Sequence, residues 1–451
     1  MSWLGSDDQV KIRQLKLAIG VCLLGASMTL SAAIFEPGVG LGWQYSDNVA
    51  LTPDDEEVDH GAVGYLGGSL IEEGGPLTYN IAGTVTRQLY ANSTFDDQTY
   101  FNLGASVRWA QVENRLNWLA DNFFTQTPIN SIGRDVPDNI QNTNVFSFGP
   151  DIAFPLSSGH RFRINPFFRD YYYEVTDTDN QQYGLDAGWS YPLYPTMRVG
   201  IDGGITDVNY DKTDVNDDYT RSQLRAVISG SRPHSEYSFN LGTSRVSRDK
   251  GSDQTGFGGG LTYLYKFTGH SSVRARVATD LTDSSQTFFD SEVNPDDGNS
   301  NNVQTSGETF RNNVFTLMYN RDDDTFDTRI WGELRKLDYD DAPLDRDVQE
   351  FGADLDYRVN AYLATGVFGS YVRFKETDQD RTDKRYVLGG RVRYNFSRKL
   401  AANVSLQYRK RDSTESNFNY NEFSALVGIV YGFVGKTTGL VGNDNITRSR
   451  Y

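Results

Sequence analysis

The chain has 451 residues, of which 60 are acidic and 43 are basic, so its formal net charge is -17. This acidic excess argues against nucleic acid as a partner, because phosphate binding requires a clustered positive field. Aromatic residues make up 13% of the chain, which argues against disorder, and the single cysteine excludes a disulfide scaffold. An aromatic- and glycine-rich β protein and an ordinary globular enzyme remain.

The first 33 residues have the order of charge and hydropathy that is typical of a secretory signal peptide. Three basic residues between Lys11 and Lys16 precede an apolar run over 17–30, and small residues follow as far as Ala33. A membrane anchor is the alternative, but the run is shorter than the roughly 20 residues that a spanning helix requires. We therefore expect residues 1–33 to be a cleavable signal for export.

The remaining chain alternates apolar and polar residues over segments of roughly 10 to 15 residues, with no lasting helical period. Clear examples are the segments 101–109, 273–281 and 351–359. Each segment has one apolar face and one polar face. No later apolar run is long enough for a spanning helix, so membrane insertion of this region must use strands.

The connections between these segments alternate in length. Short turns such as 72–76 and 321–324 lie between longer acidic loops such as 52–60 and 284–307. This layout predicts an all-β fold, a transmembrane antiparallel outer-membrane β-barrel of about 20 strands. Eighteen strands is the alternative, because the segments near Trp43 and Phe123 alternate poorly.

We expect the barrel to occupy residues 34–435, with a polar, periplasmic tail over 436–451. Both ends of the barrel then lie on the short-turn side, which is the periplasm in such barrels. Few residues separate the expected cleavage point from the first strand, so we expect no N-terminal plug, although a loop could fold inward. A soluble propeller or sandwich is the competing fold, and it is disfavoured because the segments are long and lack a fixed repeat.

The last segment resembles the C-terminal assembly signal of outer-membrane proteins. That signal has a glycine followed by aromatic residues three and five positions later, as in Gly428, Tyr431 and Phe433. The alternative is an ordinary aromatic strand. The chain departs from the usual pattern because it continues after Phe433. We expect Tyr431 and Phe433 to face lipid and to matter for assembly.

A family resemblance covers about residues 38–433 and is specific mainly in the first hundred residues. The element YSDNVAL at Tyr45–Leu51 and the short turn at Glu73–Gly75 are similar to those of the PEP-CTERM-system-associated outer-membrane proteins. These are β-barrel porins found alongside exopolysaccharide genes. The resemblance implies a barrel associated with surface polysaccharide export, as a companion of the sorting system, and it implies no catalytic residues.

Enzymatic and metal-binding patterns are weak. The four histidines lie in loops or near short turns, and no Ser/His/Asp arrangement stands out. The acidic loops 54–57 and 338–347 lack the spacing of a cation site, so we expect solvated loops beside lipopolysaccharide. We predict no enzyme, no cofactor and no metal site. We also expect Tyr171–Tyr173 and Trp331 to contribute mainly to the aromatic girdle or to packing.

Alternation also predicts a basic ladder on the inner wall. Its members are Arg274, Arg276, Arg329, Arg335, Arg391, Arg393, Arg409 and Arg411. Charges that line a narrow channel focus the field, so we predict a lumen that favours anions. In the alternative, the ladder pairs with Asp121, Asp280, Glu333, Asp354 and Asp356 and only stabilises the wall.

We therefore expect a porin-like conduit or accessory protein for exopolysaccharide export in the outer membrane of a Gram-negative cell. The alternatives are a general diffusion porin and a non-conducting structural or adhesive barrel. The expected partners are the outer membrane, lipopolysaccharide, the barrel assembly machinery, and polysaccharide or export-system proteins.

Overall fold

The computed structural model describes residues 33–156, 159–287, 306–339 and 342–432. Most of the expected signal peptide, Phe433 and the polar tail lie outside the described residues, so these predictions stay predictions.

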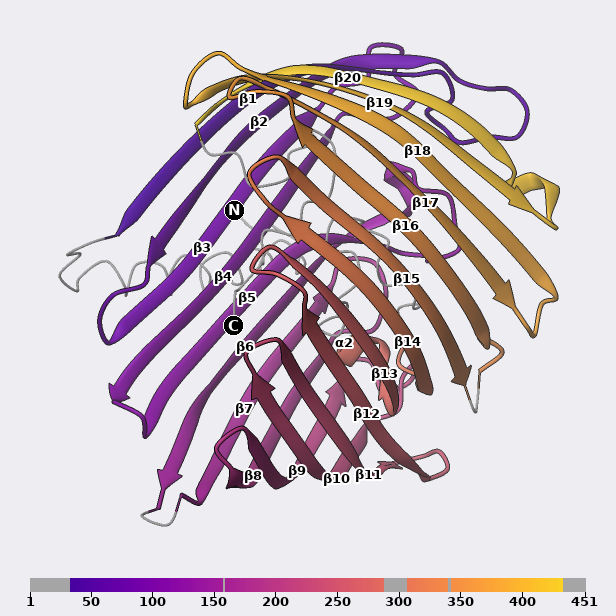
Figure 1. Cartoon of the computed structure of the whole chain (residues 1–451). Helices are drawn as coiled ribbons and strands as arrows, with labels where there is room; N and C mark the ends of the chain where they lie inside the picture. Colours follow the sequence, from indigo (N-terminus) through magenta and orange to yellow (C-terminus); the bar gives the residue numbers. More distant parts are fainter. Residues whose placement is uncertain (1–32, 157–158, 288–305, 340–341, 433–451) are drawn as a thin grey trace, which may run out of the picture.

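Twenty antiparallel strands form one closed sheet in this part of the chain (Figure 1). The strands are β1 (Ile34–Ser46), β2 (Asp59–Glu72), β3 (Leu77–Gln88), β4 (Gln98–Val112), β5 (Leu116–Pro128), β6 (Ile140–Pro155), β7 (Arg161–Tyr173), β8 (Asn180–Tyr194), β9 (Met197–Tyr210), β10 (Tyr219–Arg232), β11 (Ser235–Arg248), β12 (Gln254–Lys266), β13 (Ser271–Asp283), β14 (Thr309–Asp322), β15 (Phe326–Tyr339), β16 (Arg346–Arg358), β17 (Leu363–Glu376), β18 (Arg381–Asn395), β19 (Leu400–Ser413) and β20 (Tyr420–Gly432).

The barrel closes between its first and last strands. β1 pairs with β20 from Gly38↔Gly432 to Ser46↔Ser424, so no open sheet edge remains at this seam. The predicted barrel of about 20 strands is confirmed. The alternative count of 18 is wrong, because Trp43 and Phe123 both lie within paired strands despite their poor alternation.

The two faces of the wall follow the period of two along each strand. On β20, Val427, Ile429 and Tyr431 are about half exposed, whereas Leu426 and Val430 between them are buried inside the barrel. Large apolar residues are exposed in the same alternating manner on strands around the barrel. A continuous apolar outer face of this size requires a lipid environment. No helix in the described ranges is long and apolar enough to cross a bilayer.

The two ends of the barrel differ, and we call them the short-turn end and the loop end. At the short-turn end, Pro195 and Thr196 alone connect β8 to β9. The loop end carries the connections 47–58, 129–139 and 284–308. Short 3-10 helices lie in two loop-end connections, η2 (Pro137–Asn139) and η3 (Ser416–Phe418). β1 begins and β20 ends at the short-turn end.

The wall is interrupted between β12 and β13 near the loop end. These strands pair only between Lys266↔Ser272 and Gly259↔Thr279, whereas β13 stays paired with β14 as far as Asp283. An arginine from β14 reaches the opened edge, where Arg311 Nη1 donates to the carbonyl oxygen of Phe257 at 3.1 Å. The part of β13 nearest the loop end, residues 280–283, is therefore separated from β12.

Ion pairs fix the departing part of β13 against a strand that is not its neighbour. Asp280 accepts from Arg221 at 2.8 Å and from Arg225 at 2.5 Å, both on β10. Beyond it, Asp283 accepts from the Tyr219 hydroxyl, and the short helix α2 (Ser284–Thr287) follows. This part of β13 thus covers the inner faces of β10 and its neighbours.

Candidate functional site in the barrel lumen

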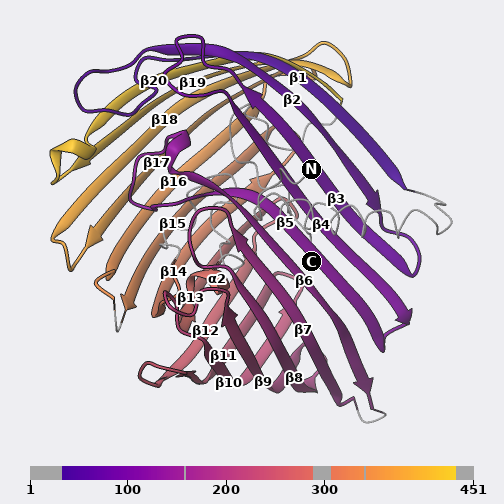
Figure 2. The same ribbon diagram turned by 180° about the vertical axis from the view of Figure 1, so that it is seen from behind.

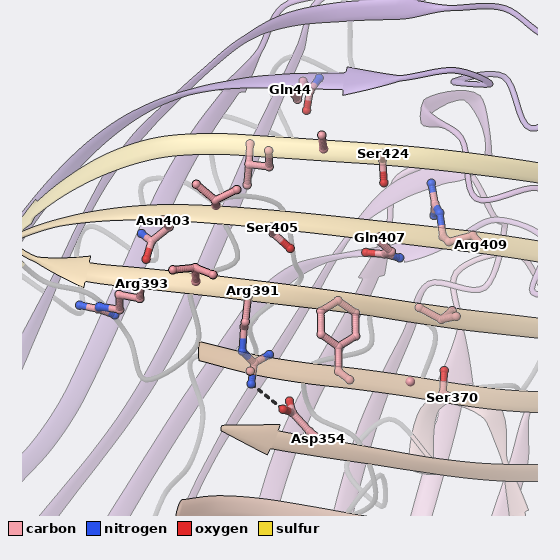
Figure 3. A pocket seen from close by; sticks show the side chains of 18 of the residues that line it. Gln44, Asp354, Ser370, Arg391, Arg393, Asn403, Ser405, Gln407, Arg409 and Ser424 are labelled. Carbon is pink, nitrogen blue, oxygen red and sulfur yellow. Dashed lines mark hydrogen bonds and ion pairs between the residues drawn. The ribbon is translucent and has the colours of Figure 1, made fainter. Parts of the chain in front are cut away.

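A cavity of about 1370 Å³ lies inside the barrel, along the inner faces of β1, β3 to β5 and β15 to β20. Neutral polar side chains and arginines line the part drawn in Figure 3. The residues labelled there are Gln44, Asp354, Ser370, Arg391, Arg393, Asn403, Ser405, Gln407, Arg409 and Ser424. The cavity is the candidate pathway for a hydrophilic solute, since amides, hydroxyls and guanidinium groups line this stretch and can form hydrogen bonds with it.

β19 supplies a regular series of polar groups to this cavity. Asn403, Ser405, Gln407 and Arg409 occupy alternate positions and share its inner face. The alternation places one polar group about every 7 Å along the strand. The Asn403 Nδ2 atom is buried without a hydrogen-bond partner among the described residues.

The eight arginines of the predicted ladder occupy inward-facing strand positions, but they do not form one continuous surface. Four of them, Arg329, Arg391, Arg393 and Arg409, line the large cavity. Arg274 lines a second space of about 510 Å³ at the short-turn end. The other three of the ladder are Arg276, Arg335 and Arg411. Arg335 and Arg411 are buried in the wall.

Acidic partners neutralise several of these arginines. Arg391 contacts Asp354 at 2.5 Å and Asp356 at 2.5 Å. Further ion pairs of the ladder join Arg335 to Glu333, Arg409 to Glu422, and Arg411 to Asp383. These contacts favour the structural alternative at those positions, while the ion preference of the whole lumen stays a prediction.

The remaining acids that the sequence proposed as partners contact other groups. Asp280 pairs with Arg221 and Arg225, which were not in the predicted ladder, and Asp121 accepts from the Ser106 hydroxyl at 2.6 Å. Arg393 donates to the neutral amide of Asn395 at 3.0 Å and forms no ion pair within the described ranges. Arg393 is therefore the least compensated cation of the ladder in the large cavity.

The loop between β5 and β6, residues 129–139, folds inward at the loop end. Figures 1 and 2 draw this connection, in purple, running from the ends of β5 and β6 into the region of the view where β16 and β17 are labelled. Arg411 Nη1 donates to the carbonyl oxygen of Gly133 at 2.7 Å, and Arg346 Nη1 donates to the Ser131 hydroxyl at 2.9 Å. We call this segment the inward loop. It narrows the lumen beside the large cavity.

Sequence reasoning missed a group of buried tyrosines in the part of the lumen that β7, β9 and β10 line. Tyr171 and Tyr173 point inward and are 1% and 5% exposed, so they lie in the interior and not in an aromatic girdle. Tyr210 and Tyr219 are buried there as well, beside Leu281 of β13. Trp331 is likewise internal and donates its indole N–H to Glu350 at 2.9 Å. Alternation along β7 groups Tyr171 with Tyr173, but it does not say which face is internal.

The assembly-signal residues that the structure describes lie on opposite faces of β20. Gly428 faces inward, paired with Gly42 of β1, and Tyr431 is 52% exposed on the outer face. Their role in assembly stays a prediction. No group of three or more potential ligands within the described ranges is arranged to hold a metal ion.

A match to a family of barrel proteins agrees with the architecture over the last five strands. The family described as "Putative beta-barrel porin 2" matches residues 346–433, which include β16 to β20. No curated protein matches the chain.

Solved structures with similarity include the FrpB iron transporter from Neisseria meningitidis (F5-1 variant). It is 9% identical, with 88% of this chain and 82% of that chain covered and a TM-score of 0.48. The siderophore receptor PirA from Pseudomonas aeruginosa is 13% identical, with 89% and 80% covered and a TM-score of 0.44. The closed barrel, its apolar outer face and the family match over 346–433 describe an outer-membrane β-barrel with a porin-like fold.

Proposed function

We propose that the protein is an outer-membrane conduit for a hydrophilic saccharide chain and that it acts in exopolysaccharide export. The observation that carries this proposal is the series of amides and hydroxyls that β19 presents to the cavity of about 1370 Å³. Saccharide hydroxyl groups both donate and accept hydrogen bonds, and such side chains can exchange with them along a path. The resemblance of the first strands to barrels found near exopolysaccharide genes supports the same substrate class.

The proposal includes the expected surroundings of the barrel. Lipopolysaccharide surrounds the loop end, the barrel assembly machinery inserts the chain, and export-system proteins deliver the polysaccharide at the short-turn end. No catalytic step is part of this function. Incubation of the purified barrel with the exopolysaccharide should leave the polymer length unchanged.

Two measurements test the proposal. Purified protein in a planar bilayer should conduct ions, and a deletion strain should secrete less exopolysaccharide while its uptake of small solutes stays normal. Conductance with normal polysaccharide secretion would instead identify a general diffusion porin.

A non-conducting structural barrel is the second candidate. It is favoured by the inward position of β13 against β10 and by the inward loop, which both narrow the lumen. Absence of conductance in the wild-type protein and in a variant that lacks residues 130–138 would select this candidate.

A further inference from the structure

We propose that Arg346, Arg381, Arg385 and Arg411 form a carboxylate-binding site for an acidic saccharide. In the structure, oxygen atoms of the inward loop occupy this site, and the ligand would replace them. The proposal rests on the proposed function and deepens it, because it names the charge of the transported chain.

The four guanidinium groups converge on the tip of the inward loop from three strands. Arg411 donates to the carbonyl oxygens of Gly133 and Ile132, and Arg381 Nη2 donates to that of Ile132 at 3.4 Å. Arg385 Nη2 donates to the carbonyl oxygens of Ser131 and Gly133, each at 3.4 Å. The acceptors supplied by the loop tip are thus neutral, and the Arg381 and Arg385 contacts are long for hydrogen bonds.

This cluster carries more positive than negative charge. Its carboxylates are Glu376, which contacts Arg346 at 3.0 Å, and Asp383, which contacts Arg411 at 2.7 Å and Arg381 at 2.9 Å. Arg385 forms no ion pair within the described ranges. Among the described residues, these two carboxylates form ion pairs with three of the four guanidinium groups, and carbonyl and hydroxyl oxygens of the inward loop are further acceptors. An anion is a stronger acceptor than a carbonyl oxygen.

Aromatic rings hold the guanidinium groups in place. The centroid of the Phe418 ring lies 3.7 Å from the guanidinium carbon of Arg381 and 5.1 Å from that of Arg411. The Phe374 ring lies 4.7 Å from that of Arg385. Stacking of this kind fixes the planar group and leaves its N–H edges available to a carboxylate, which arginine binds in a two-point manner. The site is therefore organised before any ligand arrives.

A solute that moves along the large cavity from the short-turn end would reach this cluster. Arg385 lines the cavity, as does Arg409, whose Nη1 lies 4.0 Å from Asp135 of the inward loop. The Nε atoms of Arg385 and Arg411 are buried and have no hydrogen-bond partner among the described residues. A carboxylate that moves along the cavity towards the loop end would meet Arg385 and then compete with the carbonyl oxygens of Ser131 and Gly133.

The first experiment measures binding without requiring transport. A hexamer of galacturonic acid and neutral maltohexaose are titrated into the detergent-solubilised full barrel by calorimetry. We expect the acidic hexamer to bind and the neutral hexamer not to bind. The double variant Arg381→Gln/Arg385→Gln should weaken binding by about tenfold or more, because two charge-assisted contacts are lost.

A matched control removes a different inward-facing arginine. Arg163 on β7 pairs with Asp151 at 2.7 Å, away from the inward loop, and Arg163→Gln should leave the affinity unchanged. Heat-modifiable migration on a detergent gel shows whether each variant is folded. Equal binding of the two hexamers, or wild-type affinity in the folded double variant, would overturn the site. Equal competition by sulfate would identify a general anion site and overturn the saccharide assignment.

A second readout follows the inward loop directly. Ser131 is 7% exposed, so Ser131→Cys should react slowly with a maleimide, and the acidic hexamer should accelerate the reaction. An unchanged labelling rate at saturating hexamer would show that the loop does not compete with the ligand. Retained hexamer binding in a barrel that never conducts would contradict the proposed conduit and leave the binding site standing.

Discussion

The side chain of Asn139 forms two hydrogen bonds with the main chain of Asn130 at the base of the inward loop. The Asn139 Nδ2 atom donates to the carbonyl oxygen of Asn130 at 2.9 Å, and its Oδ1 atom accepts from the Asn130 N–H at 2.9 Å. The same Nδ2 atom also donates to the carbonyl oxygen of Arg134 at 2.8 Å. At Gly133, a Cβ atom would lie only 2.6 Å from Asn139 Nδ2, so glycine permits this close packing. The loop therefore has its own internal hydrogen bonds in addition to its contacts with the opposite wall.

We predict that Asn139→Ala enlarges the pore. The substitution removes the hydrogen bonds that brace the loop, each worth about 1 kcal/mol, so the loop should leave the lumen more often. Single-channel recordings should show a higher mean conductance and noisier open states. Asn92→Ala is the control, because Asn92 donates to Val58 in a different loop. Identical recordings for Asn139→Ala and wild type would mean that the loop does not limit conduction.

We predict that Arg335→Met strongly destabilises the barrel. Arg335 and Glu333 are buried and 2.8 Å apart, so loss of the arginine leaves a carboxylate without its cation. The expected loss in the free energy of unfolding in urea is about 3 kcal/mol, and adding Glu333→Gln should recover part of it. For the exposed pair of Arg87 with Asp97, Arg87→Met should cost no more than about 1 kcal/mol. Equal losses for the two pairs would contradict the buried-charge argument.

We predict a pH-dependent contribution from the loop between β7 and β8. Burial, together with the nearby carboxylates Asp211, Asp170 and Asp177, raises the pKa of Asp179 from 3.8 to about 6. Folding therefore takes up a proton between these two values, so the charged Asp179 destabilises the fold above pH 6. This destabilisation should diminish as the pH falls from 6 towards 4.

Urea midpoints between pH 4 and 8 check this prediction. Asp179→Asn should be more stable than wild type at pH 7.5 and should lose the pH dependence in that window. The exposed loop carboxylate Asp214 provides the control substitution Asp214→Asn. A wild-type pH profile in Asp179→Asn would exclude Asp179 as its source.

We predict opposite shifts in ion selectivity from the two partners of one lumen ion pair. Asp354→Asn leaves Arg391 with only Asp356 and should move the reversal potential towards anion preference. Arg391→Gln removes the cation that both acids contact and should move the reversal potential towards cation preference. Asp207→Asn, on the outer face of β9, should have no effect. Shifts of the same sign for Asp354→Asn and Arg391→Gln would exclude this pair from the ion path.

We predict that Tyr431→Ser combined with Phe433→Ser lowers the amount of folded barrel in the outer membrane. Tyr431 is exposed on the lipid face at the end of β20, where a polar side chain is costly and the assembly signal is expected. The heat-modifiable band in outer-membrane fractions measures the folded protein, and Tyr431→Phe is the conservative control. Normal folded levels in the double variant would show that these residues are not an assembly signal.

Alternation along the strands was enough to predict the barrel and to indicate which side chains of a strand share a face. It works because the period of two depends only on local backbone geometry. Arg409 and Tyr408 show this directly, since the first lines the cavity and the second is exposed on the outside. Strand number followed from the spacing of turns, even where Trp43 and Phe123 weakened the pattern.

Alternation does not predict contacts between segments that are far apart in the sequence. The donation from Arg411 to Gly133 joins residues 278 positions apart, and neither local sequence indicates it. The ion pairs of Asp280 with β10 depend on the departure of β13 from β12, which alternation does not encode. The pairing of Arg391 with Asp354 lay among the proposed alternatives, although alternation does not show that the contact reaches from β18 to β16 across β17.

The interrupted pairing between β12 and β13 also has a mechanical consequence. Between Gly259↔Thr279 and the loop end, these strands share no ladder of main-chain hydrogen bonds, and the Arg311 contact with Phe257 and the ion pairs of Asp280 bridge the region instead. A pulling force applied at the end of β20 should extract hairpins one after another until it reaches this boundary. Rupture between β13 and β12 should then need less force than rupture between fully paired strands. The barrel therefore has a mechanically weak junction that is far from the seam between β1 and β20.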